Sequence, residues 1–221
     1  MLLVIGIPGL VFSWLVRRRR WMYPLADFGA QAWLRTCGAS VKVRGLENLD
    51  ADTQYVFASN HRSYLDTATL FSFTGKRIGI VAKKELLKVP VLGQGMSFVN
   101  LIAIDRSNAE RARRSMERAR EVMAEGYSFG VFVEGTRGMP GELLPFKKGA
   151  FHLAIQTQAP IVPVAIKNTD RMMPKRGDVA YTGEIEMVIL PPISTAGKTI
   201  HDVMELLLKT RNAVAAELSR E

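Results

Sequence analysis

Short apolar runs alternate with amphipathic segments along most of this chain, and this alternation limits the fold more than any other feature. The runs predict strands near 39–44, 54–59, 78–82, 101–104, 129–133, 161–167 and 184–190. The amphipathic segments predict helices near 22–36, 64–74, 108–125, 149–157 and 199–219. Strands that alternate with helices are typical of an α/β fold. We therefore expect one α/β domain over residues 38–221, with a mixed, largely parallel sheet flanked by helices.

The first 37 residues differ from the rest of the chain. Leu2–Val16 is apolar, and four arginines follow it over residues 17–20. A signal peptide would carry its positive charge before the apolar run. As a helix the run would be about 22 Å long, against roughly 30 Å for a hydrocarbon core. All 3 tryptophans fall in this region, as expected for membrane-interface aromatics.

We therefore predict that residues 1–37 form a helical hairpin that anchors the protein in one leaflet. The arginines would lie at the anionic headgroups of the cytoplasmic face of the inner membrane. This is a monotopic association rather than a full span. Two alternatives stay open: an N-terminal core helix with a basic collar, and a single tilted span.

The net charge narrows the set of partners. Lys and Arg number 30 against 21 Asp and Glu, which gives a formal net charge of +9. Such a surface suits nucleic acid, anionic lipid or a phosphorylated substrate. Recognised nucleic-acid motifs are absent from the sequence, so we expect no nucleic-acid partner. The single cysteine, Cys37, excludes an intramolecular disulfide and a cysteine-based zinc site.

The predicted helix near 108–125 is rich in both arginine and glutamate. Glu110 and Arg114 are four residues apart, which is the spacing of an ordinary surface ion pair on a helix. A solvated helix face is the favoured interpretation. The alternative is a docking face for anionic lipid or for an acidic acyl carrier protein.

The run Asn60–Asp66 carries the clearest chemistry. His61 follows a predicted buried strand, and Asp66 lies five positions later at the start of a predicted helix. A carboxylate that folds back onto a histidine can hold it in one tautomer, so that the ring acts as a general base. We predict that His61 and Asp66 form such a catalytic pair. The other histidines, His152 and His201, lack partners at ligand spacing, and we expect no metal site.

Four runs of sequence, in order, resemble the glycerolipid acyltransferase family, which includes enzymes that make phosphatidic acid from lysophosphatidic acid. The first is Asn60–Asp66, with the His-x4-Asp spacing. The others are Ala82–Leu86 with its continuation to Arg106, Glu134–Arg137, and Ala159–Val164. Two positions depart from the family pattern: Val133 stands where Pro is usual, and Gly138 where Ser is usual.

The resemblance implies an enzyme that transfers an acyl chain from a thioester to the sn-2 hydroxyl of 1-acylglycerol 3-phosphate. His61 and Asp66 would be the base pair. The co-substrate would be acyl-CoA or an acyl carrier protein thioester, and no cofactor is expected. The same chemistry on glycerol 3-phosphate, another lysophospholipid or a lyso-aminolipid is the alternative.

The resemblance also implies which residues bind the phosphate of the acceptor. Arg106 and Arg137 each follow a predicted strand, and arginine offers a planar fork that matches phosphate. Lys83 is the third candidate, with Lys84 as its alternative. Residues that shape the site are expected in the turn between the strand and Arg137, namely Glu134, Gly135 and Thr136. Glu134 could instead pair with Arg137 or with a backbone amide.

Overall fold

The computed structural model describes residues 22–82, 102–103, 109–175 and 179–220. The strands are β1 (Ala39–Arg44), β2 (Val56–Ser59), β3 (Ile78–Ala82), β4 (Ile102–Ala103), β5 (Ser128–Phe132), β6 (Ile161–Lys167) and β7 (Gly183–Ile189). The α-helices are α2 (Met22–Thr36), α3 (Leu65–Phe73), α5 (Ala109–Ala124), α6 (Gly149–Thr157), α7 (Thr169–Met172) and α8 (Val203–Leu218). Two 3₁₀ turns, Leu46–Asn48 and Ile200–Asp202, complete the described elements.

The strands form one mixed sheet in the order β1-β7-β6-β2-β5-β3-β4. From β6 to β4 all neighbours are parallel, whereas β7 runs antiparallel to β6 and β1 runs parallel to β7. The carboxyl ends of β2, β3, β4, β5 and β6 therefore meet at one edge of the sheet. In open α/β sheets this edge is where ligands bind.

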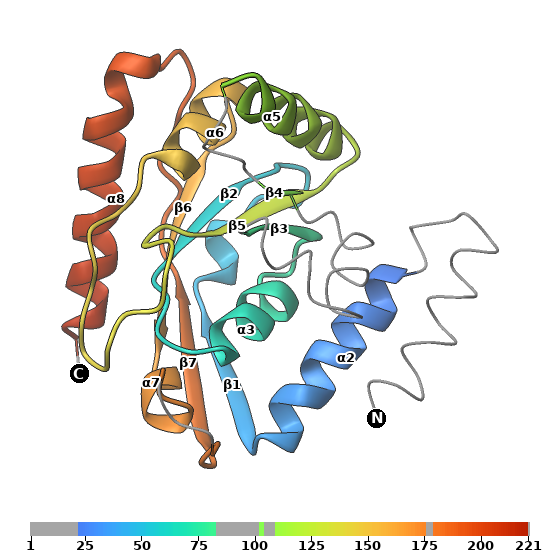
Figure 1. Cartoon of the computed structure of the whole chain (residues 1–221), viewed down its shortest axis with the longest axis vertical. Helices are drawn as coiled ribbons and strands as arrows, with labels where there is room; N and C mark the ends of the chain where they lie inside the picture. The colour runs from blue at the N-terminus through green and yellow to red at the C-terminus, as the bar shows by residue number, and fades with distance from the viewer. Residues whose placement is uncertain (1–21, 83–101, 104–108, 176–178, 221) are drawn as a thin grey trace.

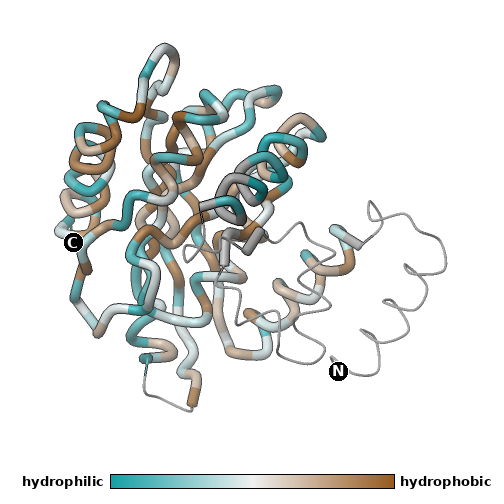
Figure 2. The backbone as a smooth tube through the Cα atoms, turned by 45° about the horizontal axis from the view of Figure 1, so that its top comes forward, coloured by the Kyte–Doolittle hydropathy of each residue, from teal (hydrophilic) through white to brown (hydrophobic). Residues whose placement is uncertain are grey.

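Helices cover both faces of the sheet. One face packs against α5, α6 and α8, and the other against α2, α3 and α7. Figure 1 shows α8, α6 and α5 along the left and top of the molecule, with α3 at the centre and α2 to its right. In Figure 2 helices α5 and α8 are banded brown and teal, as expected for helices with one face on the core and one in water.

The central strands are apolar on both sides because both faces are covered. In β2, Val56 and Ala58 belong to one core, and Phe57 belongs to the other. All three side chains are 0% exposed. This explains why the parallel strands are continuous apolar runs in the sequence rather than alternating patterns.

The predicted fold class, an α/β domain with a mixed and largely parallel sheet, is confirmed. The predicted bounds of α2, β1, β3, α6 and β6 coincide with the observed ones. Helix α2 packs on the body of the domain: the Tyr23 hydroxyl donates to the carbonyl of Lys76 and accepts from the N–H of Ile78, and Leu34 is buried. The predicted division between an anchor over 1–37 and a domain over 38–221 stays a prediction.

The predicted N-terminal hairpin falls mainly on residues 1–21, outside the described part of the chain. Within the described part, each helix is too short or too polar to cross a membrane.

One expectation was wrong. The sequence of residues 167–183, with Pro174 and Gly177, predicts a surface excursion, yet α7 lies inside this segment, and Thr169, Asp170 and Met172 are buried. The physical reason is a long-range contact. The Asp170 carboxylate accepts from Arg62 at 3.4 Å and from the N–H of Gly141 at 3.1 Å, and this pulls α7 against the domain.

Candidate active site

Two loops meet at the carboxyl edge of the sheet, because the strands that precede them are neighbours. Ser59, the last residue of β2, is paired with Phe132, the last residue of β5. The N–H of Val133 continues this pairing by donating to the carbonyl of Ser59 at 3.1 Å. The β2–α3 loop and the β5–α6 loop therefore leave the sheet side by side, and they carry most of the predicted site residues.

The predicted pair is in hydrogen-bond contact. Nδ1 of His61 lies 2.9 Å from Oδ2 of Asp66. The same oxygen accepts from the backbone N–H groups of Arg62, at 2.6 Å, and Ser63, at 2.8 Å. Asp66 is fully buried, whereas the His61 side chain keeps 16% of its surface exposed. A carboxylate at Nδ1 favours the tautomer with the proton on that nitrogen, so Nε2 can accept a proton from a substrate.

The plane of the imidazole is fixed by an aromatic neighbour. The ring of Phe132 stacks on that of His61, with centroids 4.0 Å apart and planes inclined by 17°. Asp66 fixes one edge of the ring and Phe132 covers one face. The histidine therefore loses little orientational freedom when a substrate binds.

Glu134 holds the main chain of the histidine rather than its ring. Its Oε1 accepts from the N–H of His61 at 2.8 Å, and its Oε2 accepts from the N–H of Leu144 at 2.7 Å. The N–H of Gly138 donates to the carbonyl of His61 at 2.8 Å. Burial raises the pKa of Glu134, and the N–H groups of His61 and Leu144 oppose this rise. Of the two partners considered for Glu134, the structure shows the backbone amide.

The turn after Glu134 depends on a glycine. Gly135 has φ of +70°, which only glycine adopts without strain. A β-carbon at this position would also lie 2.9 Å from Nζ and Cδ of Lys147. The side chain of Lys147 therefore lies across the turn, close to the edge of the sheet. Thr136 is exposed.

Arg137 contacts Tyr64 in the β2–α3 loop, residues 60–64, which is called the catalytic loop here because it carries His61. Its guanidinium carbon is 3.7 Å from the centroid of the Tyr64 ring. Its Nη1 is buried and has no hydrogen-bond partner among the described residues. The Nζ of Lys175 donates to the backbone carbonyl of Arg137 at 2.6 Å. Since the guanidinium forms no ion pair with a described residue, it can bind an anionic ligand without first breaking one.

The other predicted phosphate-binding residues, Lys83 with its alternative Lys84, and Arg106, lie outside the described residues. Their roles stay predictions. In the sequence, Lys83 directly follows β3, and Arg106 comes soon after β4.

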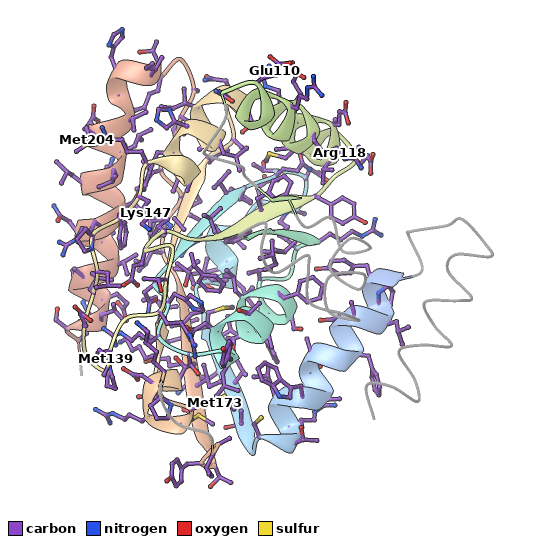
Figure 3. All side chains as sticks on the ribbon, in the orientation of Figure 1. Glu110, Arg118, Met139, Lys147, Met173 and Met204 are labelled. Carbon is purple, nitrogen blue, oxygen red and sulfur yellow. The ribbon has the colours of Figure 1, made fainter. Side chains whose placement is uncertain are left out.

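Several residues of the site had no role in the prediction from sequence. Asn60 exchanges two hydrogen bonds with the backbone of Ile166, at 2.8 and 2.9 Å, and so ties the catalytic loop to the end of β6. Lys147 lies against the turn at Gly135, and Phe132 stacks on the imidazole of His61. Neither contact is visible in the sequence. The only feature of the sequence that could have indicated a role for Asn60 is its position directly after a buried strand. In Figure 3 Lys147 and Met139 mark the β5–α6 loop at the left of the view, and Met173 lies in the lower part, next to α7.

Two arginines of α5 pair within their own helix, and a third, Arg120, donates to the carbonyl of Gln156 in α6. Arg114 pairs with Glu110 at 3.3 Å, and Arg118 pairs with Glu121 at 2.8 Å. All four side chains are well exposed. These contacts favour the solvated-face interpretation over a docking face. Groups of His, Cys, Asp and Glu that could hold a metal ion are absent from the described residues.

Comparison with known proteins identifies the family. Residues 40–167 match the Acyltransferase family. The chain belongs to this family.

Named relatives of this acyltransferase come from several kingdoms. It is 35% identical, over 80% of its length, to 1-acyl-sn-glycerol-3-phosphate acyltransferase alpha of Homo sapiens, of which the match covers 63%. It is 39% identical, over 82% of its length, to the 1-acyl-sn-glycerol-3-phosphate acyltransferase of Saccharomyces cerevisiae, of which the match covers 60%. The acyltransferase thus spans less than two thirds of these relatives.

A solved structure extends the similarity to the whole fold. The crystal structure of the 1-acyl-sn-glycerophosphate (LPA) acyltransferase PlsC from Thermotoga maritima matches with a TM-score of 0.79 and 25% sequence identity. The match covers 100% of this acyltransferase and 92% of that chain. The described helices and sheet are therefore those of an acyltransferase domain.

Proposed function

We propose that this acyltransferase transfers an acyl chain from an activated thioester to the sn-2 hydroxyl of 1-acylglycerol 3-phosphate, which gives phosphatidic acid. The contact between His61 and Asp66 carries the proposal, because it leaves Nε2 of a partly exposed imidazole free to take a proton. The names of the human and yeast relatives support this choice of acceptor.

The proposed reaction needs a base and no protein nucleophile. Nε2 of His61 removes the proton of the sn-2 hydroxyl while that oxygen attacks the thioester carbon. The new C–O ester bond forms, the C–S bond breaks, and the imidazolium returns its proton to the departing thiolate. Asp66 stabilises the imidazolium between these steps. Thioesters are already activated, so an acyl-enzyme intermediate is unnecessary.

The phosphate of the acceptor would be held by Arg137, together with Arg106 and Lys83. The support from the structure is the guanidinium of Arg137, whose buried Nη1 lacks a partner in the described part of the chain. Holding the phosphate places the hydroxyl at the thioester carbon, which converts a bimolecular encounter into a positioned reaction. Glu134, Gly135 and Thr136 belong to the turn that presents Arg137.

The proposal places the enzyme at a membrane, because both the acceptor and the product are lipids. The predicted partner is the anionic cytoplasmic face of the inner membrane, reached through the N-terminal residues. The acyl donor is proposed to be acyl-CoA or an acyl carrier protein thioester. The basic composition, +9 overall, agrees with anionic lipid and phosphorylated substrates.

The test is to incubate the full chain, in vesicles, with lysophosphatidic acid and each thioester donor, and to identify the lipid product by mass. Glycerol 3-phosphate, other lysophospholipids and a lyso-aminolipid serve as competing acceptors. His61→Ala is expected to lower turnover by about 10²–10⁴. His201→Ala is the matched control, since His201 is exposed next to α8. Undiminished turnover in His61→Ala, or a product from another acceptor alone, would contradict the proposal.

A further inference from the structure

Tyr64 is an exposed aromatic residue within the catalytic loop. It directly precedes α3, two positions before Asp66. The residue is 58% exposed although its ring is large and apolar. The guanidinium of Arg137 covers this ring at 3.7 Å. Tyr64 therefore brings the β2–α3 loop and the β5–α6 loop into side-chain contact at the place where the acceptor is proposed to bind.

The contact matters because little else fixes the guanidinium. Among the described residues, Arg137 has no carboxylate partner, and its Nη1 is buried without a hydrogen bond. Lys175 holds the backbone carbonyl of Arg137 and not its side chain. An arginine side chain has several freely rotating bonds, so an unpaired guanidinium normally samples many positions.

Stacking and phosphate binding use different parts of the guanidinium. Its π face meets the Tyr64 ring, whereas its N–H groups point outward in the guanidinium plane. A phosphate that approaches in this plane can accept two N–H groups at once without disturbing the stack. Tyr64 can thus orient Arg137 before the acceptor arrives, which reduces the entropy lost on binding.

We propose that Tyr64 is a positioning residue that orients Arg137 toward the phosphate of the acceptor. Through Arg137 it favours acceptors that carry a phosphomonoester over neutral ones. The inference rests on the proposed function, and it adds a determinant of substrate choice that lies outside the His-x4-Asp pair and outside the Glu134–Arg137 turn.

The test compares Tyr64→Leu, which removes the ring, with Tyr64→Phe, which keeps it. With lysophosphatidic acid, Tyr64→Leu is expected to raise KM about three- to tenfold, the range of a partly shielded cation–π contact, and to keep kcat within about twofold. Tyr64→Phe should retain the wild-type KM. Tyr181→Leu is the matched control, because Tyr181 is equally exposed, at 62%, and has no stacked cation in the described structure.

A double variant shows whether Tyr64 acts through Arg137. In an Arg137→Ala background, Tyr64→Leu should cause no further rise in KM. A further rise of the same size would mean that the ring touches the lipid itself, and this would overturn the proposal. The proposal is equally overturned if Tyr64→Leu leaves KM unchanged, or raises it as much for a monoacylglycerol that lacks the phosphate.

The outcomes also separate this inference from the proposed function. Wild-type enzyme that forms no phosphatidic acid from either thioester would contradict both. Normal wild-type turnover with an unchanged KM in Tyr64→Leu would contradict only the role of Tyr64. A melting temperature within a few degrees of wild type for Tyr64→Leu shows that the change in KM is local.

Discussion

Buried carboxylates are satisfied in different ways in two regions of this acyltransferase. At the carboxyl edge of β2 and β5, Asp66 and Glu134 accept chiefly from backbone N–H groups. At the far end of α8, Glu217 is only 3% exposed and is held by cations from β1, β6 and the chain end. The cations are Arg44, Lys167 and Arg220.

This difference between the two regions explains why cations near the site remain available to bind a ligand. Backbone N–H groups stabilise a carboxylate as dipoles and consume no positive side chain. Arg137 and Lys147 accordingly form no ion pair with any residue that the structure describes. At the end of α8 the cations form ion pairs with Glu217, and these ion pairs hold the end of the helix in place. Arg62 directly follows His61, but it resembles the cations at α8, because its charge is already paired with Asp170.

The largest expected effect comes from Asp66→Asn. With its NH2 group in the place of Oδ2, the amide would face the N–H groups of Arg62 and Ser63 and would favour the wrong tautomer of His61. With its oxygen there, it would keep these hydrogen bonds but lose the negative charge that stabilises the imidazolium. We expect kcat to fall by about 10³–10⁴, as when the acid of a catalytic triad is replaced by its amide. The measurement is single-substrate kinetics with lysophosphatidic acid. Asp202→Asn, at the half-buried N-terminal cap of α8, is the control, and a kcat within tenfold of wild type for Asp66→Asn would argue against the pair.

Glu134→Gln tests whether the backbone of the histidine needs its carboxylate. One end of the amide cannot accept, so the N–H of His61 or of Leu144 loses its partner. We expect kcat to fall about 10- to 100-fold, because a small displacement of the imidazole misaligns proton transfer. Glu142→Gln is the matched control from the same loop. A rise in KM with unchanged kcat would show instead that Glu134 binds the acceptor directly.

Arg137→Ala tests the claim that unpaired cations serve the ligand. Loss of a charged hydrogen bond is expected to lower kcat/KM for lysophosphatidic acid about 10- to 100-fold. The same variant should treat a monoacylglycerol like wild type, since that acceptor has no phosphate. Arg114→Ala removes an exposed arginine on α5 and is the control. Equal losses with both acceptors would mean that Arg137 supports the fold of the loop.

The part of the fold that the sequence predicts is the part set by local pattern. Strand β6 and helix α2 have their predicted bounds because each has an uninterrupted apolar or amphipathic pattern. A glycine in the turn after β5 permits an unusual backbone angle, and Gly135 has a φ of +70°. The start of α8 was predicted near residue 199, but a capping box between Thr199 and Asp202 first forms a 3₁₀ turn, and the α-helix begins at Val203.

What the sequence could not show depends on contacts between distant segments. Helix α7 is buried because Asp170 meets Arg62, and no local pattern near residue 170 announces that partner. The stack of Tyr64 on Arg137 likewise requires β2 and β5 to be neighbours, which follows from strand order and not from either loop. The sequence therefore indicated the reactive residues, and the folded chain shows which groups hold them in position.

Glu217→Gln probes the second region and is expected to leave catalysis unchanged. Burial acts to raise the pKa of Glu217, but hydrogen bonding from Lys167 and the charges of Arg44 and Arg220 outweigh it, so the pKa lies below its usual value. Its lowered pKa means that the carboxylate stabilises the fold above about pH 4.3, the usual value for Glu, and that this contribution is lost as pH falls through the folded-state pKa.

Urea unfolding of wild type and Glu217→Gln measures this contribution. At pH 7 the variant should be less stable by about 1–3 kcal/mol, the range for hydrogen bonds to a charged group. The difference should shrink as the pH is lowered below about 4, because wild-type Glu217 is then protonated as well. Activity with lysophosphatidic acid should match wild type at a temperature where both proteins are folded. A variant that keeps its stability but loses activity would break the distinction between the two regions, because the cations at α8 would then act on the site.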